Sequence, residues 1–268
     1  MMALFLQNMR YIWRTKFLAI LFFFTFIIHY VGVKLVHSMT IYLNGVISNF
    51  DSKDTLFLSL LFQLFTGTFL CAVYGIWMVP YAHEGNRTPL TFTLPVSKWK
   101  FPFVYAVCML FLLLVEHGVM VLSFGMNFGW EIFHHPDFPW SSLAVCIVLE
   151  SLAFEAMMFA FAVCSMIIGQ IPTFFLGSIM LFLLQIGGVI FRINWGQYIL
   201  RPGSSYFWSQ KVYSLLPPAG ELVVDLRQEY MKPVWAERDL ALWGAWLLVF
   251  GAFFWLKLKF PNNRRTSE

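Results

Sequence analysis

The chain has 268 residues, of which 59% are hydrophobic and 12% are charged, and its formal net charge is +4. Its mean hydropathy is +0.70. A soluble domain carries about 25% charged residues, so half that proportion argues against a soluble enzyme or binding domain and indicates a protein embedded in lipid. The small net charge is explained by membrane topology and gives no reason to expect a nucleic-acid partner.

Residues 1–16 show the periodicity of an amphipathic helix. The apolar side comprises Phe5, Met9, Ile12 and Trp13, and the polar side comprises Gln7, Arg10 and Arg14. Such a pattern is typical of a helix that lies in the plane of the membrane interface. We therefore expect an N-terminal interfacial helix.

Six apolar runs follow. In chain order they cover residues 17–35, 55–80, 101–124, 142–168, 173–191 and 240–256. About 20 apolar residues are needed to cross the hydrocarbon core of a bilayer. We therefore expect an all-α integral membrane protein with six transmembrane helices in a single domain over residues 17–258. Residues 259–268 are expected to form a tail.

Lysine and arginine are unevenly divided between the two sets of connections. One face carries ten basic and two acidic residues, a net charge of +8, whereas the other carries eight basic and nine acidic residues, a net charge of −1. Because basic connections remain in the cytoplasm, the first face, with both termini, is expected to be cytoplasmic in a cell (inner or plasma) membrane. The long segment 192–239 is then extracytoplasmic, and we expect short helices in it before the last span.

The stretch from His83 to Lys100 is the most polar part of the first half of the chain. An acidic residue is followed by a small polar run with threonine, and then by Leu-Pro-Val-Ser-Lys, which leads into the third apolar run. This stretch is longer and more patterned than a simple connection requires. We expect it to lie along the inner membrane surface and to present a short helix to a soluble partner.

This stretch and the layout around it resemble the ABC-2-type permease family, the membrane subunits of many ABC exporters. The similarity covers most of the chain, including the interfacial helix, the six spans, the very short turn at residues 169–172 and the long outer segment. It implies that two permease chains, identical or related, form a dimer around a translocation pathway, and that each binds a cytoplasmic ATPase. The helix after the second span would be the coupling helix.

The resemblance also implies which residues contact the ATPase. By position, the coupling residues would be Glu84, Arg87, Thr88, Leu94, Pro95 and Lys98, and the interfacial helix would flank the same contact through Arg10, Trp13 and Arg14. No G-x-x-x-x-G-K-[ST] loop occurs in the sequence. ATP and Mg²⁺ would therefore be bound by the partner ATPase, and we expect this chain to be a transport subunit with no catalytic residues and no cofactor of its own.

Four ionisable residues lie inside the expected spans: Glu116, His117, Glu150 and Glu155. A charge at the centre of a membrane helix costs about 2.5–3.5 kcal/mol on insertion scales. Each residue should therefore face the pathway or form a structural bond between helices. Glu150 and Glu155 are separated by about 140° around their helix, so they cannot share a face.

The outer side carries His134 and His135, but no third ligand at metal-binding spacing accompanies them, so no metal site is expected. Two other functions remain open. One is a membrane-embedded enzyme that uses Glu150, Glu155 and this histidine pair, and the other is a non-transporting membrane scaffold protein. The sequence does not identify a cargo.

Overall fold

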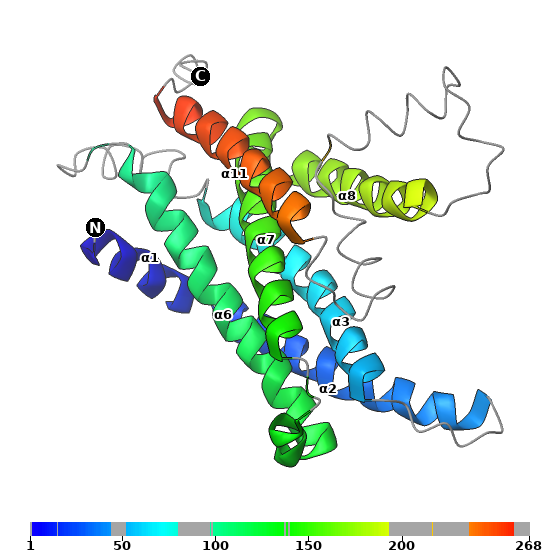
Figure 1. Ribbon diagram of the computed structural model, residues 1–268. Helices are drawn as coiled ribbons and strands as arrows, with labels where there is room; N and C mark the ends of the chain where they lie inside the picture. Colours follow the sequence, from blue (N-terminus) through cyan, green and yellow to red (C-terminus); the bar gives the residue numbers. More distant parts are fainter. Residues whose placement is uncertain are drawn as a thin grey trace, which may run out of the picture.

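The structure is a computed structural model that describes residues 2–14, 16–43, 52–79, 97, 99–136, 138, 140–192, 216 and 236–259. All regular secondary structure in these ranges is helical, which confirms the all-α prediction (Figure 1). The helices are α1 (Met2–Arg14), α2 (Phe17–Leu43), α3 (Ser52–Val73), the π-helix η1 (Tyr74–Met78), α6 (Lys100–Phe128), the 3₁₀-helix η3 (Trp130–His134), α7 (Trp140–Ile168), α8 (Gln170–Arg192) and α11 (Ala236–Lys259).

Within the described residues, three helices are long and apolar enough to cross a membrane. They are α6, α7 over Leu143–Ile168 and α11 over Leu240–Lys259. Helices α2, α3 and α8 occupy the three other predicted runs. Helices α1 and α2 would pass the same test as one unit, but they are bent by 70° at the break between them. The chain therefore has the helices of a membrane protein, and α1 departs sharply from the direction of α2.

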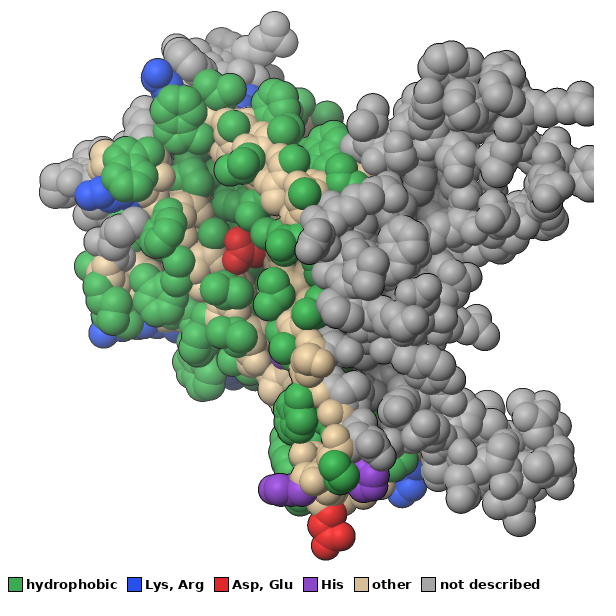
Figure 2. Space-filling view, viewed as in Figure 1, with side chains coloured by type: hydrophobic (Ala, Val, Ile, Leu, Met, Phe, Trp, Pro, Cys, Tyr) green, Lys and Arg blue, Asp and Glu red, His purple; other side chains and the backbone are tan. Residues whose placement is uncertain are grey.

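Large apolar side chains cover much of the visible surface (Figure 2). Phe103 on α6, Phe175 on α8 and Leu248 on α11 are 56%, 63% and 75% exposed. A soluble monomer rarely exposes large contiguous apolar patches, whereas helices in a bilayer do so along every face that contacts lipid. The surface supports the same conclusion as the helix lengths.

Helix α7 lies at the centre of the bundle and packs against α3, η1, α6, α8 and α11 (Figure 1). It is hydrophobic on all sides, as expected of a helix surrounded by others. Its small residues Ala153, Ala156 and Ala162 are fully buried. Small side chains allow neighbouring helices in a membrane to approach closely.

The backbone of η1, the π-helical continuation of α3, packs closely against the backbone of α7. A Cβ atom on Gly75 would lie 2.5 Å from the carbonyl oxygen of Met158, so no larger residue fits without moving α7. The hydroxyl of Ser165 donates a hydrogen bond to the carbonyl oxygen of Ile76 at 3.0 Å. A π-turn displaces backbone carbonyls from the α-helical register. The hydroxyl of Ser165 satisfies one of these carbonyls with a hydrogen bond.

The connection between α7 and α8 is shorter than the predicted turn of residues 169–172. Gly169 alone separates the two helices, with φ at +92°, a conformation that favours glycine. Pro172 falls in the first turn of α8, where its missing N–H would have had no helical partner. A single residue therefore joins α7 to α8, which runs in a clearly different direction (Figure 1).

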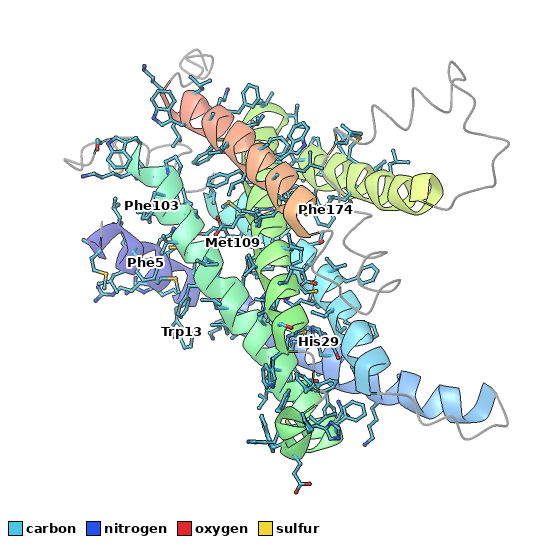
Figure 3. The ribbon with its side chains drawn as sticks, viewed as in Figure 1. Phe5, Trp13, His29, Phe103, Met109 and Phe174 are labelled. Atoms are coloured by element: carbon cyan, nitrogen blue, oxygen red, sulfur yellow. The ribbon has the colours of Figure 1, made fainter. Side chains whose placement is uncertain are left out.

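Helix α1 is fastened to the bundle by one face. Ile12 is buried in the core shared with α6, and Phe5 packs against that core. The amide nitrogen of Asn8 donates a hydrogen bond to the hydroxyl of Tyr74 at 3.1 Å. Trp13, rotated by 100° from Ile12, is 86% exposed and points away from the protein (Figure 3). The predicted apolar side of α1 is therefore divided between a protein contact and an exposed tryptophan.

The hydrogen bond between Asn8 and Tyr74 gives a first prediction. In a double-mutant cycle of Asn8→Ala and Tyr74→Phe, we expect a coupling of about 0.5–1.5 kcal/mol in the free energy of unfolding, because the bond is partly shielded from solvent. Unfolding in detergent by increasing denaturant measures it. Gln7→Ala, an exposed neighbour on the same helix, should show no coupling to Tyr74→Phe; equal coupling for both would contradict the assigned contact.

Candidate functional site

Polar side chains from four helices meet inside the bundle and are at most 5% exposed. This polar cluster consists of His29 from α2, Gln63 and Thr66 from α3, Glu116 and His117 from α6, and Glu150 from α7. Figure 3 labels His29, near the region where α6 and α7 lie together. Such a concentration of buried polar groups in an apolar bundle is costly and marks a site to be explained.

Helix α6 is the common support of the cluster, because α2, α3 and α7 all pack against it. Glu116 and His117 lie near its middle. Gln63 and Thr66 are three residues apart on α3 and so share a helix face. The ring of Phe62 meets the imidazole of His29 edge-on, with ring centres 6.3 Å apart. Aromatic packing thus closes one side of the cluster.

His117 joins two helices. Its Nδ1 lies 2.7 Å from the carbonyl oxygen of Leu113, one turn earlier on α6. Its Nε2 lies 3.2 Å from Oε2 of Glu150 on α7. The carbonyl oxygen only accepts hydrogen bonds, so Nδ1 must carry a hydrogen. The backbone of α6 therefore fixes the ring and directs Nε2 at the carboxyl of Glu150.

Glu116 has no such partner. It is 1% exposed, and neither carboxyl oxygen makes a hydrogen bond to any residue that the structure describes. Thr66 lies beside it, but the Thr66 hydroxyl approaches the backbone carbonyls of Phe62 and Gln63, at 3.2 and 3.3 Å. The carboxyl of Glu116 is thus buried among neighbours that offer it no donor in hydrogen-bonding geometry.

His29 and Gln63 face each other across the contact between α2 and α3. Among the described residues, neither imidazole nitrogen of His29 and neither amide atom of Gln63 is in hydrogen-bonding geometry with a partner. Oε1 of Glu150 likewise has no hydrogen-bond partner among the described residues. Each buried polar group left unpaired costs about 1–3 kcal/mol. A buried polar site of this kind is where proteins hold internal water molecules or protons.

The groups in the cluster suit proton exchange better than metal binding. Carboxyl and imidazole groups both bind and release protons. Within the residues that the structure describes, no group of three or more histidine, cysteine, aspartate or glutamate side chains is arranged to hold a metal ion. The side chains of the cluster can therefore bind protons and hydrogen-bond to water.

The structure brings together three of the four predicted intramembrane residues: Glu116, His117 and Glu150. Glu155 is separate. It is half-buried on another face of α7, as its angular separation from Glu150 requires. Its carboxyl lies within electrostatic range of Cys71 on α3.

The predicted coupling residues Glu84, Arg87, Thr88, Leu94, Pro95 and Lys98 lie outside the described residues. Arg10, Trp13 and Arg14 lie on α1, and all three are exposed. On the opposite end of α6, His134 is exposed in η3, and its Nδ1 lies 3.3 Å from the carbonyl oxygen of Trp130. The histidine pair therefore does not join the polar cluster.

Sequence reasoning did not identify His29, Gln63 or Thr66 as site residues. A signal was present, because each is a polar side chain within a predicted apolar run. Neutral side chains attract less attention than glutamates, and no sequence spacing relates α2 to α3. Only the packing of the helices shows that these three residues accompany Glu116.

Comparison of the chain with protein-family models, with curated proteins and with solved structures gave no match.

Proposed function

We propose that this chain is the membrane subunit of an ATP-driven exporter of the ABC-2 type. Two permease chains, identical or related, form the translocation pathway, and each binds a separate cytoplasmic ATPase, which holds ATP and Mg²⁺. The chain has six transmembrane helices and both termini in the cytoplasm of the cell membrane. The observation that carries this proposal is the docking of α1 on the two helix ends that flank residues 80–99.

These two helix ends and α1 share one core. The α3 side is represented by Tyr74 in η1, which receives the hydrogen bond from Asn8. The α6 side is represented by Phe101 and Tyr105, which belong to the same core as Ile12. A force applied to the segment between η1 and α6 would therefore act on α1, α3 and α6 together. A coupling element needs such a connection in order to move membrane helices.

Basic residues at the same end of the bundle support a cytoplasmic location. Helix α6 begins with Lys100, and the last turn of α11 contains Lys257 and Lys259. Their ammonium groups accompany interfacial tryptophans: Lys100 lies 5.8 Å from the ring centre of Trp99, and Lys259 lies 5.1 Å from that of Trp255. Paired lysine and tryptophan side chains are typical of a membrane surface, and an excess of lysine is typical of its cytoplasmic side.

The alternative of a membrane-embedded enzyme is not favoured by the arrangement of its proposed residues. Glu150 is fully buried in the polar cluster, Glu155 is on another face of α7, and His134 is exposed in η3. These groups do not converge on a common space. The experiment below distinguishes a transport subunit from a scaffold protein.

We predict that Leu94→Ala with Pro95→Ala weakens binding of the ATPase encoded beside this chain. Loss of a buried leucine contact removes about 1.5–3 kcal/mol, which corresponds to a roughly 10- to 100-fold weaker affinity. Co-purification in detergent and ATPase activity in reconstituted vesicles measure the loss. The melting temperature of the bundle should be unchanged.

The chain contains a matched control. Leu216 and Pro217 form the same dipeptide in the outer segment, and Leu216→Ala with Pro217→Ala should leave ATPase binding intact. Failure of the wild-type chain to bind any adjacent ATPase would overturn the proposal, and so would equal ATPase binding by the two double variants. A scaffold protein would give either of these results.

A further inference from the structure

We propose that the polar cluster is a proton-binding site that holds two protons, one within the His117–Glu150 hydrogen bond and one on Glu116. This inference goes beyond the transport function and does not depend on it. It rests on the geometry of His117, on the unpaired carboxyl of Glu116 and on the balance of charge among the buried groups.

The first proton follows from the two contacts of His117. Nδ1 carries a hydrogen, because the carbonyl oxygen of Leu113, 2.7 Å away, is only an acceptor. With no further proton, the lone pair of Nε2 would face the lone pairs of an ionised Glu150 at 3.2 Å. That arrangement is repulsive. A proton between the two atoms, on either Nε2 or Oε2, makes the contact a hydrogen bond and makes the pair electrically neutral.

The second proton follows from the surroundings of Glu116. Its carboxyl is 1% exposed, and no described residue, the neighbouring Thr66 included, is in hydrogen-bonding geometry with either oxygen. An ionised carboxylate buried without a hydrogen bond costs several kcal/mol, and the usual remedy is to take up a proton. Glu150 lies within electrostatic range of Glu116, and two carboxylates that share a site are not both ionised.

The balance of charge agrees with a count of two. Two carboxylates and two neutral imidazoles carry a charge of −2, which two protons cancel. The titratable groups within electrostatic range of Glu116 or Glu150 are His117 from α6, Cys71 from α3 and Cys146 from α7. His29 from α2 is in range of His117, and Glu155 from α7 is in range of Cys71 only. No lysine or arginine is buried among the residues whose side chains the structure describes. On the proposal, protons that enter the site supply the compensating positive charge.

His29 and Gln63 extend the site toward α2. The imidazole of His29 lies within electrostatic range of His117, and Gln63 lies beside it. Their unpaired atoms can bind a water molecule, which needs two to four polar partners. Such a water would join the imidazole to the other members of the cluster and would give a proton a route between α2 and α6.

The test is infrared spectroscopy of the full chain in lipid vesicles at neutral pH. A protonated carboxyl has a carbonyl stretch that is separate from the carboxylate bands and shifts in heavy water. We expect the wild type to show this band and Glu116→Gln to lose one component of it. Glu131→Gln, which removes an exposed carboxyl in η3, is the matched control and should leave the band unchanged.

Two further measurements, on a second variant and at added salt, could contradict the proposal. Glu116→Asp keeps a titratable carboxyl and should shift the frequency of the carboxylic component. This variant provides a measurement even if Glu116→Gln does not fold. In the wild type, adding sodium or potassium chloride at constant pH should not change the band. The proposal is overturned if neither substitution at Glu116 alters the band, or if salt converts it to carboxylate, since a metal cation would then supply the charge.

Discussion

Replacing Gly75 with alanine is expected to prevent η1 from packing on α7 and to remove most of the folded protein. A Cβ atom at this position would lie 2.5 Å from the carbonyl oxygen of Met158 and 3.0 Å from Cβ of Phe161. The first of these atoms belongs to the backbone of α7, so it cannot move unless the helix moves. Overpacking in a rigid core costs about 1–3 kcal/mol and occasionally more. The yield of monodisperse protein and its melting temperature in detergent measure the effect.

Two other glycines provide a graded control. At Gly67 the added atom would meet the ring of Phe154 at 2.4 Å, and at Gly118 it would meet nothing within 4 Å. A ring can shift more readily than a backbone carbonyl, so Gly67→Ala should be less harmful than Gly75→Ala. Gly118→Ala should be neutral or stabilising by up to about 1 kcal/mol, because alanine favours helix. A reversed order would show that η1 is not held against α7 as described.

Replacing Glu150 with leucine is expected to destabilise the bundle by about 3–5 kcal/mol, which is the usual cost of removing one member of a buried ionic pair. Nε2 of His117, which is 3% exposed, would lose its partner on α7 while Leu113 continued to hold the ring in place. Glu150→Gln should be much milder, because an amide can still pair with the imidazole. Thermal unfolding followed by near-ultraviolet circular dichroism gives the difference.

A second substitution, at His117, shows whether the loss of stability comes from the lost hydrogen bond or from a packing defect. If the unpaired imidazole causes the loss, then His117→Leu in the Glu150→Leu background should restore part of the stability, because neither polar group is then left alone. Glu155→Leu is the control on the same helix and should unfold like the wild type or at a higher temperature. Additive losses from the two leucine substitutions at the pair would contradict the described hydrogen bond.

The length of the apolar runs, together with helical periodicity, predicts a large part of this fold. Each apolar run contains a helix, and some helices extend beyond the predicted limits, as α2 does to Leu43. The same periodicity places Glu150 and Glu155 on different faces of α7, because five residues correspond to about 140° of helical rotation. These features depend on local sequence, and local sequence determines them well.

Features that depend on contacts between helices were not predictable. The π-helix at the end of α3 arises where Gly75 meets α7, and nothing in the sequence of η1 specifies its partner. The association of His29 with His117 requires the packing of α2 on α6. The coupling helix stays a prediction, because its residues lie outside the described part of the chain.

Helix α11 returns to α7 late in the sequence, and this order has a consequence for biosynthesis. Phe254 is fully buried between Tyr105 of α6 and Phe159 of α7, with ring centres 5.9 and 5.4 Å away. The ribosome delivers α6 and α7 to the bilayer long before it delivers Phe254. In the nascent chain, Tyr105 and Phe159 therefore contact the surrounding lipids or an insertase at the position that Phe254 later fills. Assembly is finished only when the final helix enters.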